Sequence, residues 1–235
     1  MTEGTDSALL ERFEQDIWSK VPHLEEGSET RVVNATPLVD MTADFKECAK
    51  TVFKLDLDNA DLKVFGKMDS TLLTGSIKVR PAANIINDAI VTGKLRSGQT
   101  VIEATSGNFG ISLGLLSKLG LNVIALVSRK LQEGVFEELR NGNTRTIDLD
   151  MDICPAPGME GKQDLVIAKA TAVNVRSQLS NLGFDTDIFD KEISEIESLL
   201  AKQDIINLAK FLAKIYGFFC PAQYDNQLNI EAHRT

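Results

Sequence analysis

One lysine stands where a helix does not favour a positive charge. In TGSIKVRPA, residues 74–82, Lys78 and Arg80 follow a Thr-Gly-Ser turn and open an apolar run with helical spacing. The positive end of the helix dipole disfavours an ammonium group there. Together with Arg80 and partial burial, it is expected to lower the pKa of Lys78, as imine and general-base chemistry require. A solvated lysine at a helix start is the alternative.

A second motif, VIEATSGNFGISLG, covers residues 101–114. It predicts a strand, a Ser-Gly-Asn turn and a helix rich in small residues. Such a turn points backbone N–H groups and short polar side chains at the carboxyl end of the strand, where α/β sheets bind ligands. The pattern therefore favours an anion site.

Three other interpretations of this motif compete. Gly107, Gly110 and Gly114 do not fit the G-x-G-x-x-G pattern of a dinucleotide site. Residues 110–114 do spell G-x-S-x-G, the nucleophile elbow of hydrolases, but that elbow needs a strand running up to its first glycine. Here the turn intervenes and puts Ser112 inside the helix, in a chain with two histidines. A glycine-rich packing turn without chemistry is the third alternative.

The elements that position these motifs alternate between helix and strand. Apolar periodicity and turn residues predict a parallel α/β sheet with helices on both faces. A short amphipathic helix near the N-terminus precedes two strands within 51–69 that turn at Asp58 and Asn59. Residues 190–217 are expected to be helical with a break near Gln203 and a capping box at Ser194 and Glu197. The remaining expected helices are 77–91, 108–119, 131–142 and 163–179, and the remaining expected strands are 99–104, 121–128, 144–150 and 217–224.

Composition excludes several classes of protein. A net charge of −9 and the lack of a basic stripe argue against nucleic-acid binding. No apolar run has the length of a membrane span, and the first residues lack the pattern of a signal peptide. Three widely spaced cysteines, Cys48, Cys154 and Cys220, fit reduced thiols and a cytoplasmic location.

The two motifs, followed by PAQYDNQLNIEAHRT at 221–235, resemble the fold-type II pyridoxal-phosphate enzymes, which include cysteine synthase and cystathionine β-synthase. The resemblance implies a tryptophan synthase β-like fold and pyridoxal 5'-phosphate as cofactor. It implies that Lys78 forms the internal aldimine and that Asn108 binds the 3' oxygen of the pyridine ring. It also implies that Thr105, Ser106, Gly107 and Asn108 hold the substrate carboxylate together with Gln223.

The resemblance further implies an arm at 1–34 and an α/β region at 35–235. That region is expected to contain a smaller mobile subdomain at about 104–182 and a helical insertion at about 183–217. A homodimer is expected. The family's glycine-rich phosphate loop has no counterpart before Thr235. This favours a fold that is C-terminally incomplete, as a fragment, a truncated product, or a chain whose cofactor site a second polypeptide completes.

The activity implied is β-replacement on a serine-derived amino acid through an aminoacrylate intermediate. Phe109 stands where the family has a threonine, and Val79 where cysteine synthases have an aspartate. These two departures keep a serine/threonine dehydratase-type β-elimination open. A catalytically silent fragment or assembly partner is the alternative of another class. No metal site is expected.

Overall fold

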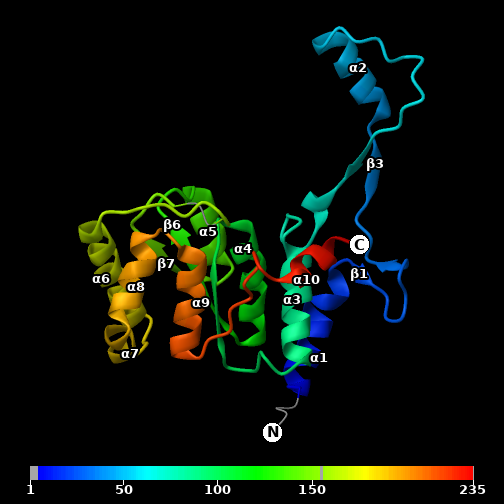
Figure 1. Ribbon diagram of the computed structural model, residues 1–235. Helices are drawn as coiled ribbons and strands as arrows, with labels where there is room; N and C mark the ends of the chain where they lie inside the picture. Colours follow the sequence, from blue (N-terminus) through cyan, green and yellow to red (C-terminus); the bar gives the residue numbers. More distant parts are fainter. Residues whose placement is uncertain (1–4, 154–155, 235) are drawn as a thin grey trace.

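A parallel sheet of three strands lies between two layers of helices in the computed structural model, which describes residues 5–153 and 156–234 (Figure 1). The strand order is β5-β6-β7, with bounds Thr100–Ala104, Asn122–Ser128 and Arg145–Leu149. Every residue of β5 is buried, as expected of a strand covered on both faces. The expected parallel α/β sheet is confirmed. Cys154 and Thr235 lie outside the described residues.

Side chains that alternate along the strands pack into two separate cores. Ile102 and Ile124 belong to a cluster with α6 (Leu165–Asn181), α8 (Ile193–Ala201) and α9 (Ile205–Tyr216). Val101 and Val123 belong to a cluster on the other face. That face is covered by α1 (Ser7–Asp16), α3 (Val79–Val91), α4 (Asn108–Gly114) and the 3-10 helix η3 (Leu115–Leu119), with α5 (Glu133–Asn141) beside them.

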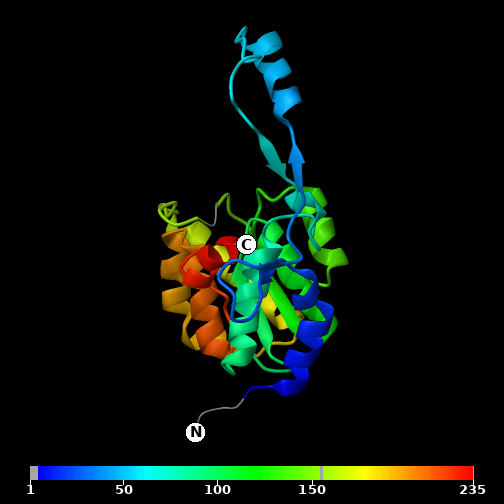
Figure 2. The same cartoon turned by 90° about the vertical axis from the view of Figure 1, so that its right-hand side faces the viewer.

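A thin projection leaves this body near the start of α3. It consists of β3 (Leu38–Asp40), α2 (Thr42–Val52) and β4 (Phe65–Lys67), and both views show α2 far from the sheet (Figures 1 and 2). We call residues 38–67 the ribbon. β3 and β4 pair antiparallel, and large apolar side chains of the ribbon are exposed, with Phe53 at 68% and Leu38 at 64%. A shorter antiparallel pair, β1 (His23–Leu24) with β2 (Val32–Val33), precedes it.

The ribbon corrects one expectation. Of the two strands expected within 51–69, with a turn at Asp58 and Asn59, the first is wrong because α2 extends to Val52. The second is confirmed only at Phe65–Lys67, the residues of β4, which pair with β3 and not with the first expected strand. The alternation of apolar residues after Val52 falls on an irregular, largely exposed loop. This short run therefore has the alternation typical of a strand, although its residues form a loop outside the parallel sheet.

The C-terminal third is helical, and its expected break is confirmed. α8 ends at Ala201 and α9 begins at Ile205, with Gln203 between them at a positive φ of 56°. The expected capping box is wrong, because Ser194 lies inside α8 and Glu192 occupies the N-cap. The strand expected at 217–224 shrinks to one parallel bridge, Val101 with Phe219. The other short elements are η1 (Trp18–Lys20), η2 (Asp69–Thr71), α7 (Thr186–Lys191), α10 (Gln227–Glu231) and η4 (Ala232–Arg234).

Among the described residues, no helix is long and apolar enough to span a membrane.

Candidate active site

Lys78 occupies the N-cap position of α3 and is half-buried. Its backbone N–H donates to Ser76 Oγ at 3.3 Å. Its Nζ makes no hydrogen bond or ion pair with any residue that the structure describes. Burial, and then the positive charge of Lys78, lower the pKa of His233, which places η4 within electrostatic reach of this lysine. Within the described part of the chain, Lys78 thus has no acidic partner.

Arg80, two residues further along, is buried in the protein. Its side chain is 1% exposed, donates to Thr36 Oγ1 and lies 3.5 Å from the Asp69 carboxylate. Burial lowers the pKa of Arg80, while Asp69 opposes that effect. These contacts tie α3 to η2 and to the segment before β3. Arg80 therefore holds the lysine turn in place.

The Ser-Gly-Asn turn follows β5 directly and is fastened by Thr105. The Thr105 Oγ1 accepts the N–H groups of Gly107 and Gly110, each at 3.2 Å. Gly107 has a φ of 135°, and a Cβ there would lie 2.7 Å from Val135 Cγ1, so the turn requires glycine. Ser106 and Asn108 are exposed, and neither side chain has a hydrogen-bond partner among the described residues.

The two predicted motifs meet where α3 and α4 pack together. Thr74 Oγ1, in the lysine turn, lies 3.0 Å from Ser112 Oγ in α4. Ser112 is 3% exposed and also donates to the Asn108 carbonyl oxygen at 2.9 Å. This geometry is that of a buried helical serine, which argues against a nucleophile elbow. Phe109 is buried in the core, so its position offers no hydroxyl to a ligand.

Gln223 is brought to the same end of the sheet from 119 residues away. Its Nε2 donates to the Ala104 carbonyl oxygen at 3.2 Å, at the carboxyl end of β5. The side chain is 3% exposed, and its amide oxygen accepts no hydrogen bond from the described residues. The Thr105–Asn108 turn and Gln223 thus lie at the carboxyl end of β5, and the contact of Thr74 with Ser112 joins the lysine turn to the helix that follows the Ser-Gly-Asn turn.

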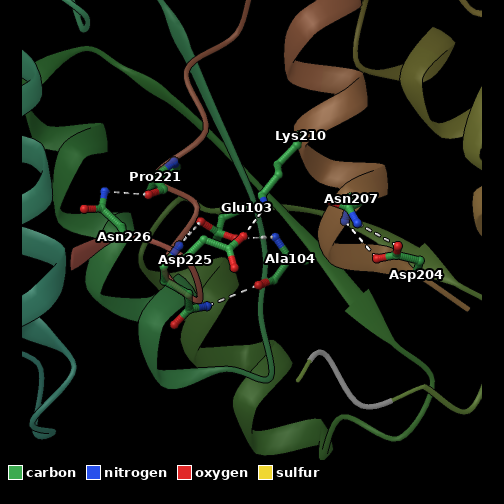
Figure 3. A network of polar contacts seen from close by, with 9 residues as sticks. Glu103, Ala104, Asp204, Asn207, Lys210, Pro221, Asp225 and Asn226 are labelled. Carbon is green, nitrogen blue, oxygen red and sulfur yellow. Dashed lines mark hydrogen bonds and ion pairs between the residues drawn. The ribbon is translucent and has the colours of Figure 1, made fainter. Parts of the chain in front are cut away.

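Sequence reasoning missed Glu103, the residue that fastens Gln223 (Figure 3). Glu103 lies in β5, is 1% exposed, and accepts the backbone N–H groups of Ala104 and Gln223 at 3.1 Å each. Burial raises the pKa of this carboxyl to about 7, against the effect of those donors. The available signal was a single carboxylate in an otherwise apolar strand.

A family model described as "Pyridoxal-phosphate dependent enzyme" matches residues 51–235, most of the chain. The chain belongs to this family. The resemblance of its lysine and Ser-Gly-Asn motifs to pyridoxal-phosphate enzymes is confirmed at the level of the family. The family's cofactor is pyridoxal phosphate.

The similar proteins are longer than the segments they share with this chain. Cysteine synthase of Aquifex aeolicus is 36% identical over 94 residues, which are 40% of this chain and 26% of that protein. Cysteine synthase B of Pseudomonas syringae pv. syringae is 32% identical over 100 residues, 42% of this chain and 57% of that protein. The chain thus covers less than two thirds of either relative.

A solved structure agrees on the fold. O-ureido-L-serine synthase, in a crystal with O-ureido-L-serine, aligns with 93% of this chain and 46% of its own, with a TM-score of 0.54 and 19% sequence identity. At this identity the likeness concerns the fold, and the expected fold class is confirmed.

The residues of the site fit the aldehyde and ring side of pyridoxal phosphate. The cofactor's aldehyde needs an amine, and Lys78 Nζ is held by no carboxylate among the described residues. The ring oxygen needs a hydrogen-bonding group, and the Asn108 amide is equally uncommitted within 5–153 and 156–234. The chemistry of these two side chains therefore suits the group.

Proposed function

We propose that this chain provides the lysine side of a pyridoxal-phosphate-dependent enzyme that performs β-replacement on a serine-derived amino acid. The observation that carries the proposal is the meeting of the lysine turn and the Ser-Gly-Asn turn, joined by the 3.0 Å contact of Thr74 and Ser112. The similar proteins support the substrate class, because they include cysteine synthases and O-ureido-L-serine synthase.

Lys78 would attach the cofactor and move the substrate's proton. Its Nζ has no acidic partner among the described residues, so the amine is not held away from the cofactor by an ion pair. As general base, the neutral amine would accept the proton from the substrate's α-carbon. The cofactor, when bound, supplies an electron sink for the charge that develops at that carbon.

The neighbouring residues would bind and orient. The Asn108 amide would hold the cofactor's 3' oxygen, and the Ser106 hydroxyl would donate to the substrate carboxylate. The Gln223 amide would reach the same carboxylate through the N–H that Ala104 does not use. Thr105 and Gly107 would shape the turn, since Thr105 Oγ1 already accepts two backbone N–H groups within it.

Cofactor attachment tests this assignment. Pyridoxal phosphate is added, the protein is reduced with borohydride, and the modified lysine is located by peptide mass spectrometry. The label should fall on Lys78 and should vanish in Lys78→Ala, while Lys118→Ala, which removes an exposed lysine of η3, should keep it. A label that persists undiminished in Lys78→Ala would refute the assignment.

Asn108→Ala and Gln223→Ala should separate cofactor binding from substrate binding. Asn108→Ala should weaken cofactor affinity by about fivefold, because it removes roughly one hydrogen bond of about 1 kcal/mol. Gln223→Ala should raise the KM for O-acetyl-L-serine and leave the cofactor's absorbance unchanged. Unchanged cofactor affinity in the first variant, or a changed spectrum in the second, would contradict these roles.

β-Elimination is the second candidate, and buried Phe109 favours it. Where the family has a threonine, this chain offers no hydroxyl to the substrate carboxylate. Water rather than a second nucleophile would then complete the reaction. Product analysis with O-acetyl-L-serine and sulfide distinguishes the two, because replacement gives cysteine and elimination gives pyruvate and ammonia.

We also propose the assembly in which the site works. Within the chain, it has the arm at 1–34, the subdomain at about 104–182 that moves on ligand binding, and the helical insertion at about 183–217. The chain forms a homodimer in the cytoplasm, and a second polypeptide completes the cofactor site. The exposed apolar side chains of the ribbon support a partner surface. Free Cys48 and Cys220 support a reducing compartment. Light scattering of the wild type against Phe53→Lys tests whether the ribbon carries the contact.

A further inference from the structure

The burial of the Glu103 carboxylate needs a physical explanation. It is 1% exposed near the carboxyl end of β5, and no lysine or arginine among the described residues forms an ion pair with it. Burying a carboxylate costs several kcal/mol unless hydrogen bonds replace its water. Its two oxygens do have donors, the N–H of Ala104 on Oε1 and that of Gln223 on Oε2. The second donor lies 120 residues away.

The hydrogen bond from Gln223 to Glu103 holds this segment to β5 beyond the point where the backbone pairing ends. Phe219 exchanges two backbone hydrogen bonds with β5, donating to Thr100 and accepting from Ile102, at 2.9 Å each. After Phe219 the ladder stops, and Ala222 takes a positive φ of 50°, which is unfavourable for a residue with a Cβ. The Glu103 carboxylate then supplies the acceptor that a strand would have provided.

The other side of this turn is held by amides. Asn226 Nδ2 donates to the Pro221 carbonyl at 3.0 Å, and Asn229 Nδ2 donates to the Gln223 carbonyl at 2.7 Å. These bonds anchor the turn to α10, whereas Glu103 and the Ala104 carbonyl anchor it to β5 (Figure 3). Of these two β5 anchors, Glu103 is the one that a side-chain substitution removes.

We propose that Glu103 is a positioning residue: its carboxylate holds the 221–223 turn against β5 and so fixes the Gln223 amide beside the Thr105–Asn108 turn. The inference rests on the proposed role of Gln223 at the substrate carboxylate. When Glu103 is protonated, one of its oxygens carries a hydrogen and competes as a donor with the Gln223 N–H. Ionised Glu103 therefore holds the turn more tightly than the neutral acid does.

The charges around Glu103 bear on its protonation. Lys210 of α9 favours the ionised form, although it is paired with Asp225 at the surface. The Cys220 thiol has its pKa raised to about 12 and stays neutral. Because burial outweighs these groups and raises the Glu103 pKa to about 7, the hold on Gln223 is expected to weaken below neutral pH.

Glu103→Gln is the matched substitution, since it keeps the shape and one acceptor but turns an N–H donor towards the Gln223 N–H. Amide hydrogen exchange at pH 8 should become about tenfold faster at Gln223 and stay unchanged in β6. Asp148→Asn, which neutralises an exposed carboxylate of β7 that does not contact the turn, should change neither. In the wild type, the Gln223 amide shift should follow one titration with a midpoint of about 7.

The kinetic arm separates positioning from mere support of the fold. In the holoenzyme, Glu103→Gln should raise the KM for O-acetyl-L-serine several-fold with kcat within a factor of two, and should add nothing in the Gln223→Ala background. If Glu103→Gln leaves the amide exchange at Gln223 unchanged, or leaves the KM unchanged, the inference about Glu103 is overturned and the proposed role of Gln223 is not affected. An unchanged KM in Gln223→Ala overturns it together with the proposed role of Gln223.

Discussion

The buried Glu103 carboxyl should make the protein less stable as the pH rises. Its pKa is about 7 in the folded state against an ordinary value of 4.5. Between these values the folded protein keeps a proton that the unfolded chain has released, so the free energy of unfolding falls with rising pH. Below 4.5 and above about 7 this contribution is constant, because both states then bind the same number of protons.

The size of the effect follows from the difference in pKa. One pKa unit corresponds to about 1.4 kcal/mol, so the full contribution is roughly 3 kcal/mol. Glu103→Gln cannot ionise and lacks it. The free energy of unfolding of the variant minus that of the wild type should therefore increase by roughly 3 kcal/mol from pH 5 to pH 8. Taking this difference cancels His233, whose lowered pKa gives a trend of the opposite sign in both proteins.

Urea unfolding followed by far-UV circular dichroism, at half-unit steps from pH 5 to 8, measures the difference directly. Asp148→Asn serves as control: burial also raises the pKa of Asp148, but from a lower ordinary value of 3.8. A difference between Glu103→Gln and the wild type that stays constant within about 0.5 kcal/mol over this range would refute the reasoning, because it would mean that Glu103 titrates alike in both states.

Three further substitutions test local geometry by urea unfolding. Gly107→Ala should lower the free energy of unfolding by roughly 1–3 kcal/mol, because of its φ of 135° and the contact with Val135, whereas Gly134→Ala in open space should not; equal effects would contradict the glycine requirement. Ala222→Gly should raise it by up to about 1 kcal/mol by relieving a positive φ, while Ala49→Gly inside α2 should lower it by about 1; destabilisation by Ala222→Gly would count against strain in the turn. Phe189→Ala should lower the free energy of unfolding by about 3–5 kcal/mol because the ring is fully buried, and Phe53→Lys on the ribbon should lower it by less than about 0.5 kcal/mol. A large loss of stability in Phe53→Lys would show that the ribbon packs in solution.

Much of the sheet and its helices was predictable from local patterns. Strand 121–128 is a near-continuous apolar run, and Gly120, which follows η3, takes the left-handed conformation expected after a helix. The failures occurred where a tertiary neighbour decides the structure. Within 51–69 only residues 65–67 pair, and their partner is β3 rather than the other half of the expected hairpin; of the expected 217–224 strand, only Phe219 pairs, with Val101 in β5.

The candidate site divides in the same way. Lys78 and the Thr105–Asn108 turn could be recognised from short stretches of sequence. A lysine at the start of a helix and the spacing of the glycines each involve only a few neighbouring residues. The sequence did not show that Thr105 accepts hydrogen bonds within its own turn, or that Glu103 accepts one from Gln223. Each depends on a hydrogen bond that only the folded backbone creates, in one case across 120 residues.

The long separation between β5 and Phe219 also has a kinetic consequence. Closing a loop of over a hundred residues costs more chain entropy than the short crossovers between β5, β6 and β7. The pairing of Phe219 with Thr100 and Ile102 should therefore form after the three strands have associated, and during synthesis it must wait until α9 has been made. Until then the outer edge of β5 is bare and able to pair with another chain. Folding at low protein concentration should thus give a higher yield than folding at high concentration.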